Sequence, residues 1–516
     1  MYNLENINFD DDLDSEIDEE IKAQIDEELG IKKELNELQC FQLFFSDQII
    51  DALVSESNNY YRKILIEKYG NNYMEIILAK NSFGTYPFLY VTRGISKEDI
   101  LAFIGMRIYM GIRKYPNIEC YWNGSFLYKT DFNTIMPKNY YFLLAKCLHF
   151  PEKEEKKDEK ESKCTNSNSG KEESETYENG GLIDPRHKIN FYLEKLAENF
   201  QKHYELGENI TIDESLLHFK GRNSMKFYIP MKPHKWGFKI HLLCDADTHY
   251  LYNMLFDPGK VCKDFIYTEN SSSLAESIVL KLLSCINDKK RRNVFCDGWY
   301  SSISLMKKLT KMGYLNTTVL RANSKDLPPK IKLEGYDKAY NDEILIQKYE
   351  GKKTIYFATN YKIDKEELRN IYNIKNRGVD TFDQYLEISS CQRKTKKWYK
   401  KIFLFGIDAS IINAKIIYEQ RTGKSFTTVK FKEKLIEQIF KIYRKKRKYY
   451  NYNNNFENND CAQFKFNFYF HNIENTINND KVCKICRKKT SYICAECNIH
   501  LHPECFTKYH NKYIYK

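Results

Sequence analysis

Acidic residues stand at the ends of several predicted elements. Asp213 follows the alternating strand segment ITI, Asp297 closes the apolar segment NVFC, and Asp380 and Asp383 lie three residues apart near a predicted helix start. The spacing of three places the last two on one face of that helix. Carboxylates that converge from strand ends and a helix can hold two divalent ions, and oxygen ligands suit Mg²⁺ or Mn²⁺. Two such ions about 3.5–4 Å apart stabilise the attacking and leaving oxygens of phosphoryl transfer.

Basic and aromatic residues follow each carboxylate motif. They help to decide whether the carboxylates form a metal site or are only exposed to solvent at the ends of strands and helices. The segment FKGRNSMKFYIPMKPHKWGFK comes after Asp213, and CQRKTKKWYKK comes after Asp383. Cations contact phosphates, whereas aromatics such as Trp236 and Trp398 either stack on exposed bases or pack in the core. A solvated charged face is the alternative for any single run, but the recurrence favours a phosphate-binding surface. The candidate DNA contacts are Lys220, Arg222, Lys232, Lys235, Arg393, Lys394, Lys396 and Lys397.

Cysteine and histidine residues gather near the C-terminal end, in CKICRKKTSYICAECNIHLHPECFTKYH. Cys-x2-Cys pairs followed by His and Cys are typical of structural zinc sites, and the metal supplies folding energy that so short a segment lacks. We expect two interleaved ions, with a single ion as the alternative. The expected ligands are Cys483, Cys486, His502 and Cys505 for one ion, and Cys494, Cys497 and His510 for the other. His500 is either a surface residue or the eighth ligand.

Charge is unevenly distributed along the chain of 516 residues, which is long enough for two or three domains. The net charge is +11, from 81 basic and 70 acidic residues, yet residues 1–30 are rich in Asp and Glu and contain a single Lys. The remainder is therefore strongly basic, which fits a polyanionic partner such as nucleic acid. The acidic leader is predicted to be disordered, and it either screens the basic surface or only improves solubility.

Other features argue against secreted and membrane proteins. The chain opens with MYNLENINFDDD, which has no apolar signal segment, and it has no run of about 18 uncharged apolar residues. The 15 cysteines do not form a secreted disulfide pattern, because five fall at metal-ligand spacing between Cys483 and Cys505. We therefore expect an intracellular, reduced protein without membrane contact.

The elements that must position the candidate residues comprise a helical part and then a mixed α/β part. Residues 38–150 show helical periodicity, and Ser96 followed by two acidic residues marks a predicted helix start in SKEDILAFIGMRIYMGI. Next come the helix HKINFYLEKLAENFQKHY and the strands NITIDES, KFYIP, GFKIHLLCDA and YLYNMLF, with a hairpin at DADTHY. The helix SSLAESIVLKLLSCI, the strand NVFCDGW, the helix SSISLMKKLTKMG, the strands TTVLRA and TIYFATNY, and helices over 365–420 follow. This alternation predicts an α/β core.

Several long motifs resemble those of the transposase family named after piggyBac, and they occur in that family's order over roughly residues 40–420. They are IDESLLHFKGR, YIPMKPHKWGFKIHLLCDADTHYLYNMLFDPGK, FCDGWYSSISLMKKL, TTVLRANSKDLP and NRGVDTFDQYLEISSCQRKTKKWYKKIFLFGIDASIINA. The resemblance implies that Asp213, Asp297 and Asp380 are catalytic ligands of Mg²⁺ (or Mn²⁺), with Asp383 as an additional active-site carboxylate.

The sequence departs from the family pattern at a few positions. The motif DGWYSS has Gly298 where members commonly have Asn, and Ser where they commonly have Thr. The Cys/His segment has His502 where the family usually has Cys, and the family has no counterpart of His500. All the catalytic Asp positions are retained.

The resemblance also implies the fold and the domain order. The expected α/β fold has a ribonuclease-H-like DDD transposase core with an inserted β-rich domain, an N-terminal helical domain and a small C-terminal zinc-binding module. The predicted parts are an acidic tail at 1–37, a helical dimerisation and DNA-binding domain at 38–150, a low-complexity linker at 151–185, the core at 186–314 and 371–423 with its insertion at 315–370, a basic and Asn-rich linker at 424–480 and the zinc-binding domain at 481–512. KIYRKKRKYY in the second linker is a nuclear localisation signal, a phosphate-binding helix or a solvated helix face.

The function implied by the resemblance is cut-and-paste DNA transposition in the nucleus by a homodimer. Strand cleavage, hairpin formation and transfer into TTAA target sites would all occur at the Asp site, with double-stranded DNA of the element's terminal repeats as substrate. The zinc-binding module would help to bind that terminal DNA, or alternatively read a protein such as a chromatin tail. The alternative for the whole chain is a domesticated, non-catalytic DNA- or chromatin-binding protein derived from a transposase.

Overall fold

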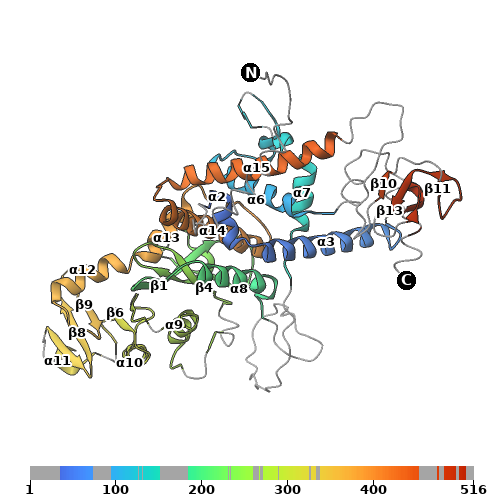
Figure 1. Ribbon diagram of the computed structural model, residues 1–516. Coiled ribbons are helices and arrows are strands. Elements are labelled where there is room, and N and C mark those ends of the chain that lie inside the picture. The colour runs from blue at the N-terminus through green and yellow to red at the C-terminus, as the bar shows by residue number, and fades with distance from the viewer. Residues whose placement is uncertain are drawn as a thin grey trace, which may run out of the picture.

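The computed structural model is built around one large mixed sheet (Figure 1). The described residues are 35–73, 94–151, 184–452, 473–475, 481–494, 499–506 and 509, with short gaps at 126, 131, 231, 233, 260–265, 268–270, 289, 325–326, 333–336 and 352. Within these residues, no helix is both long enough and apolar enough to cross a membrane.

The large sheet has nine strands in the order β2-β3-β1-β5-β6-β9-β8-β7, and β4 also pairs with β3. Its strands are β1 (Asn209–His218), β2 (Lys226–Tyr228), β3 (Trp236–Asp245), β4 (Leu251–Phe256), β5 (Asn293–Cys296), β6 (Leu315–Leu320), β7 (Lys338–Asn341), β8 (Ile344–Tyr349) and β9 (Ile355–Thr359). The central strands β1, β5 and β6 run parallel, whereas β3 is antiparallel to β1. The predicted strands over 209–256 and 293–296 and the hairpin at DADTHY are confirmed.

Both faces of the central sheet are covered by helices, because its side chains alternate between two apolar clusters. Ile210 and Ile212 of β1 pack with the apolar face of α9 (Leu274–Leu283) and α10 (Ile303–Lys311). The opposite face packs against α8 (His187–Lys202) and α14 (Trp398–Thr422). Helices α12 (Lys365–Lys375) and α13 (Gly378–Glu387) reach β1 on this second side.

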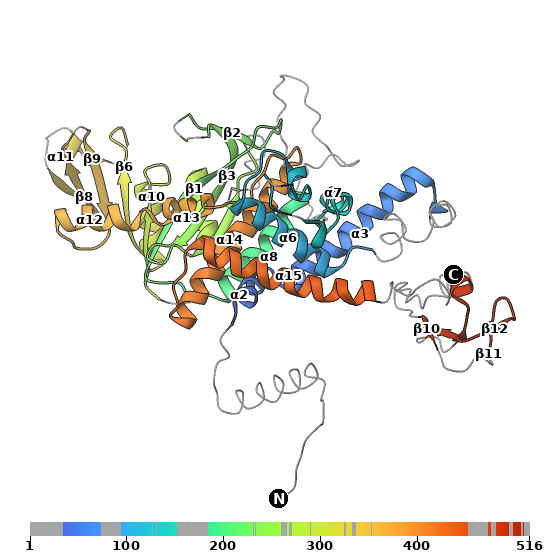
Figure 2. The same cartoon turned by 90° about the horizontal axis from the view of Figure 1, so that it is seen from above.

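The N-terminal helices join the second face and form one continuous core with it (Figure 2). They are α2 (Glu37–Phe44), α3 (Asp47–Tyr69), α6 (Lys97–Ile112) and α7 (Lys138–Cys147), with 3-10 turns η1 (Ile118–Trp122) and η2 (Phe132–Thr134). The predicted helix start at Ser96 is confirmed, since its side chain accepts a hydrogen bond from the Asp99 N–H in a capping box. Helix α14 is buried over most of its length, which explains its nearly continuous apolar sequence.

Two segments differ from the expectation in their local structure. In the segment 424–480, expected to be a linker, helix α15 (Thr428–Tyr452) packs Phe431, Leu435 and Ile439 into the core against α6. The insertion expected at 315–370 includes β6, which pairs with β5 in the central sheet, and β7 to β9 continue the same sheet outward with α11 (Pro329–Lys332) beside them. Hydrogen bonding between β6 and β9 therefore joins these strands into one sheet.

A small module with its own core contains the Cys/His segment, and both views show it beyond the end of α15 (Figures 1 and 2). Its strands are β10 (Ile473–Asn475), β11 (Lys481–Val482), β12 (Lys489–Thr490), β13 (Tyr492–Cys494) and β14 (Ile499–His500).

Candidate active site and metal centre

The register of the sheet brings Asp213 and Asp297 side by side. Strands β1 and β5 pair in parallel up to Ile212 opposite Cys296, so each Asp is the next residue on its own chain segment. The sequence placed Asp213 and Glu214 at the end of the strand NITIDES, but β1 continues further, to His218, because β3 pairs with it over this whole length. The pairing between β1 and β5 ends just before Asp213 and Asp297. The two strands separate there, and both carboxylates lie at this opening in the sheet.

Helix α13 supplies the other two carboxylates, and a glycine permits its close approach to β1. A Cβ added to Gly378 would lie 2.2 Å from Cγ2 of Thr211. Asp380 follows in the first turn of α13, and Asp383 one turn later is the acceptor for Ser215 of β1. Side chains two residues apart on a strand point to the same face. The face of β1 opposite to Ile212 therefore carries Thr211, Asp213 and Ser215 toward α13.

We call Asp213, Asp297, Asp380 and Asp383 the carboxylate cluster. Burial, together with the charges of Asp297, Glu214 and Asp380, raises the pKa of Asp213 to about 8. Burial also raises the pKa of Asp383 to about 7, although Ser215 and Lys232 act in the opposite direction. Oδ1 of Asp383 is buried and has no hydrogen-bond partner among the described residues.

The chemistry of the donor set, which consists of carboxylate oxygens, is the kind that suits divalent metal ions. Asp213 and Asp297 are neighbours whose mutual repulsion is unfavourable when both are ionised, and a bound cation would remove that repulsion. Asp297 is further held by the N–H of Trp299, which donates to its Oδ1 at 2.8 Å. The exposed side of Asp380 leaves the site open toward a substrate.

A basic cavity of about 1120 Å³ adjoins the cluster at Asp383. Five of the predicted DNA contacts line it: Lys220, Arg222, Arg393, Lys394 and Lys396. Arg393 is fixed in place by hydrogen bonds to the Tyr121 hydroxyl and the Tyr115 carbonyl, so part of the wall is anchored to the N-terminal helices. The cavity is large enough for a segment of nucleic-acid backbone, and its cations suit phosphate.

The other predicted contacts lie elsewhere. Lys232 donates to the carbonyl of Glu214 at 3.3 Å, beside the cluster, whereas Lys235 is exposed on the strand hairpin. Lys397 lies over the rings of Tyr60 and Tyr399 and is turned toward the N-terminal helices.

The two tryptophans differ in their environment. Trp398 packs against Phe238 and Phe256 in the core, in agreement with the core alternative. Trp236 is 47% exposed, pairs with Tyr228 at 4.7 Å between ring centroids, and has the Lys226 ammonium over its ring.

Sequence reasoning missed several residues of the cavity wall. Lys114 comes from the N-terminal helical part and gave no local signal. Lys401 belongs to the basic run after Asp383 but was not among the predicted contacts, and it is on α14 and largely buried. Burial lowers the pKa of Lys401 to about 8. His218 and His234 also line the wall, with ring centroids 4.3 Å apart, and neither gave a signal in the sequence.

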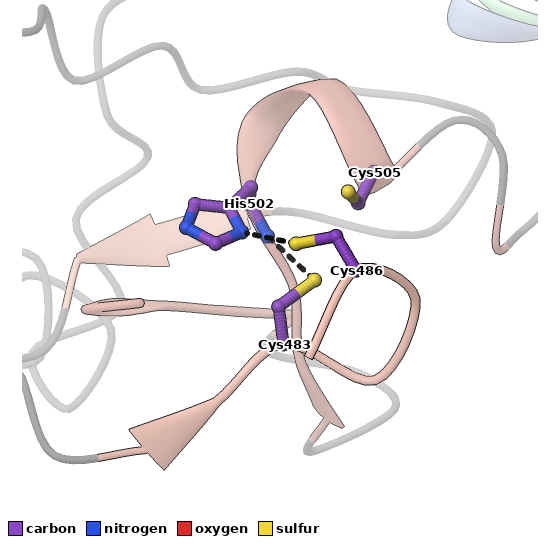
Figure 3. Close-up of side chains that lie close together, drawn as sticks. All are labelled: Cys483, Cys486, His502 and Cys505. Atoms are coloured by element: carbon purple, nitrogen blue, oxygen red, sulfur yellow. Dashed lines mark hydrogen bonds between the residues drawn. The ribbon is translucent and has the colours of Figure 1, made fainter. Parts of the chain in front are cut away.

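The Cys/His segment gathers one of the two predicted ligand sets (Figure 3). The ligand atoms of Cys483, Cys486, His502 and Cys505, which we call the Cys/His group, all lie within 4.8 Å of one another. Nε2 of His502 bonds the carbonyl of Lys489 at 2.9 Å, which leaves Nδ1 toward Cys486 at 3.2 Å as the metal-facing nitrogen.

Electrostatics also favours a cation in this group. Although burial acts to raise it, the backbone N–H groups of Cys486 and His502 lower the pKa of Cys483 to about 6. Burial and the neighbouring thiols raise the pKa of Cys505 to about 12, as expected when thiolates are crowded without a cation. Of the second set, Cys494 is buried in the module, and Cys497 and His510 lie outside the described residues. His500 lies on β14 and is not part of the group.

Comparison with known proteins defines the class. Residues 36–415 match the model of a transposase family described as Transposase IS4, which covers more than half of the chain. The chain therefore belongs to a family of transposases, and the relatives identify it as the piggyBac type.

Two human relatives and one solved structure carry this assignment. PiggyBac transposable element-derived protein 2 of Homo sapiens is 21% identical over 74% of this chain and 61% of its own length. PiggyBac transposable element-derived protein 3 of Homo sapiens is 20% identical over 64% of this chain and 60% of its own. The chain thus spans about three fifths of these relatives. The piggyBac transposase in a synaptic complex with hairpin DNA shares the fold, with a TM-score of 0.63 and 23% identity over 91% of this chain and 97% of that chain.

Proposed function

We propose that the protein is a cut-and-paste DNA transposase that uses a two-metal Asp site. The observation that carries this proposal is the register that sets Asp213 beside Asp297 at the end of their parallel pairing, with Asp380 of α13 near enough for its charge to act on Asp213. The basic cavity next to Asp383 provides the matching surface for a polyanionic substrate.

We propose further that the core is ribonuclease-H-like. Support comes from the sheet order β4-β3-β1-β5-β6, in which β3 runs antiparallel to a parallel trio, and from the placement of the acidic residues on the two neighbouring parallel strands and one helix. In this proposal β7 to β9 form the insertion between the second and third catalytic positions.

Each residue would have a distinct task during strand cleavage. Asp213, Asp297 and Asp380 would hold Mg²⁺ (or Mn²⁺), and Asp383 would support that site from α13. When bound, the metal pair supplies an activated nucleophile and neutralises charge on the attacking and leaving oxygens. Lys220, Arg222 and the Arg393 run would orient the DNA backbone, and the same site would serve cleavage, hairpin formation and joining at TTAA.

The proposed partners follow from the same surfaces. Double-stranded DNA of the terminal repeats would occupy the basic cavity, and the Cys/His module, with zinc bound, would contact those repeats as well. The related piggyBac transposase is in a synaptic complex with hairpin DNA, which supports paired DNA ends held by a homodimer of this chain. Such a protein would act on chromosomal DNA, so we propose a nuclear location.

A second candidate is a domesticated DNA- or chromatin-binding protein that no longer cuts. The names of the human relatives, which describe element-derived proteins, favour it. Inverted repeats and TTAA duplications around the gene would argue against it.

The deciding experiment is cleavage of a donor DNA that carries the repeats flanking the gene. We expect Mg²⁺-dependent nicking and hairpin formation by the wild type and none by Asp297→Ala. Equal background from both proteins, with retained DNA binding, would support the second candidate and overturn the enzymatic one.

A further inference from the structure

A buried histidine on the opposite side of the sheet is tied to the loop that carries Asp297. His241 of β3 has no exposed surface, and its register partner on β1 is Glu214, the neighbour of Asp213. Because side chains alternate, Glu214 and His241 face α9 and α10 while Asp213 faces α13. The histidine is therefore behind the carboxylate cluster and outside the substrate side.

Both ring nitrogens of His241 have side-chain partners. Nε2 is 3.3 Å from Oδ2 of Asp257, and Nδ1 is 2.7 Å from the hydroxyl of Tyr300. Oδ1 of Asp257 accepts a hydrogen bond from Gly259 N–H, so this carboxylate is itself fixed. With Nε2–H donating to Oδ2 of Asp257, Nδ1 is left to accept the Tyr300 O–H. Burial lowers the pKa of His241, in keeping with this neutral form.

Tyr300 belongs to the turn that fixes Asp297. Its N–H donates to the carbonyl of Asp297 at 3.2 Å, and Trp299 N–H donates to the carboxylate. The Trp299 ring lies parallel to that of His241, with centroids 5.7 Å apart and 12° between planes. The side chains of Tyr300 and Trp299 thus both rest on His241, while their backbone N–H groups hold Asp297.

We infer that Asp257, His241 and Tyr300 form a positioning relay that sets the angle of the Asp297 carboxylate in the metal site. This inference rests on the proposed function, because it assigns a purpose to the position of Asp297. A buried network of polar side chains is destabilising unless each group has a hydrogen-bond partner. Here Asp257 bonds His241, and His241 bonds Tyr300. Removal of one link would let the turn after β5 rotate, and outer partners of this kind change metal affinity by about 10- to 100-fold.

Metal affinity tests the relay without reference to catalysis. Zinc-loaded full-length protein would be titrated with Mn²⁺, with free Mn²⁺ followed by electron paramagnetic resonance. Tyr300→Phe, which removes only the hydroxyl, should weaken Mn²⁺ binding about tenfold, and His241→Leu should weaken it more. His241→Gln retains a donor and an acceptor and should restore affinity to within about threefold of wild type.

A matched control separates positioning from stability. Tyr250→Phe removes another buried tyrosine hydroxyl, which donates to the Phe200 carbonyl at 2.8 Å, remote from the relay. It should destabilise the fold about as much as Tyr300→Phe and leave Mn²⁺ affinity unchanged. If Tyr300→Phe and Tyr250→Phe bind Mn²⁺ equally well, the relay has no positioning role. If wild type and Asp297→Asn bind Mn²⁺ alike, the proposed function itself fails, so the two failures can be told apart.

Discussion

The carboxylate cluster and the Cys/His group are assembled over very different distances along the chain. The four residues of the Cys/His group lie between Cys483 and Cys505, on short turns beside β11 to β14. The carboxylate cluster extends from Asp213 to Asp383 and depends on parallel pairing, on strand alternation and on one tight helix approach. A local site needs the metal to fold its module, whereas a site made by the sheet exists before any metal arrives.

The largest effect that we expect is on the rate of DNA cleavage, which should depend on the carboxylate cluster and not on the Cys/His group. Asp213→Asn should lower Mg²⁺-dependent cleavage by about 1000-fold or more, because it removes a central ligand of the cluster. Cys483→Ser should leave metal-dependent nicking of a DNA without terminal repeats nearly intact, since the Cys/His group is distinct from the cluster. Rates measured with saturating Mg²⁺ on the same nonspecific substrate would compare them, and equal losses from both variants would contradict the division.

Loss of zinc should affect the small module and leave the large sheet intact. Cys483→Ser should reduce the zinc content by one ion per chain and unfold the small module, because structural zinc contributes about 10–16 kcal/mol in such segments. Metal analysis and hydrogen exchange over residues 481–494 would show the loss, with the exchange of β1 as internal reference. Unchanged zinc content would remove Cys483 from the ligand set.

The helix approach at Gly378 offers a backbone test of the cluster. Gly378→Ala should displace α13 and destabilise the protein by about 1–3 kcal/mol, because the new methyl group would overlap Thr211. Mn²⁺ affinity should fall with it, since Asp380 and Asp383 move together. Gly351→Ala is the control, as its nearest neighbour to an added Cβ is 3.9 Å away. Equal denaturation midpoints for both variants would contradict the close approach.

The raised pKa of Asp213 predicts a pH effect of known sign. Its pKa rises from 3.8 to about 8 on folding, so the folded state binds more protons than the unfolded state between these values. The stability of the metal-free protein should therefore fall as pH rises from about 4 to about 8. Asp213→Asn should flatten this slope and exceed wild-type stability at pH 8 by about 1–3 kcal/mol. Urea unfolding at several pH values measures it, and parallel slopes would contradict the burial of this charge.

The smallest expected effect concerns the basic cavity. Replacing Lys220 and Arg222 by Ala should weaken DNA binding and reduce the magnitude of the salt slope by about 2, because each cation neutralises one phosphate. Lys430→Ala is a control on α15, where the ammonium pairs with Glu433 at 3.2 Å. Binding isotherms at several salt concentrations give the slopes, and an unchanged slope for the double variant would exclude these residues from the interface.

The two sites differ in how far they could be predicted from the sequence. The Cys-x2-Cys spacing followed by His and Cys within a short segment predicted the Cys/His group, because ligands so close in sequence can be recognised without tertiary structure. Asp213 and Asp297 could be identified as candidates from strand ends, but only the parallel register makes them neighbours. The continuation of β1 from Ser215 to His218 was missed, since it depends on pairing with β3.

The same limit applies to buried polar contacts. His241 gave no signal within an apolar strand, because its partners Asp257 and Tyr300 are remote from it in sequence. Likewise, α15 looked like part of a basic linker because its apolar residues are diluted by lysines, yet Phe431 and Leu435 are fully buried against the N-terminal helices. Long-range packing decides such cases, and a local pattern does not contain it.

The most direct test of the central claim is the location of Mn²⁺ in crystals of the full-length protein soaked with this ion. We expect an anomalous scattering peak between the carboxylates of Asp213 and Asp297, within contact of Asp380, and its absence in Asp297→Ala. A peak elsewhere on the protein, with these carboxylates hydrogen-bonded to one another or to water alone, would contradict the assignment of the cluster as a catalytic metal site.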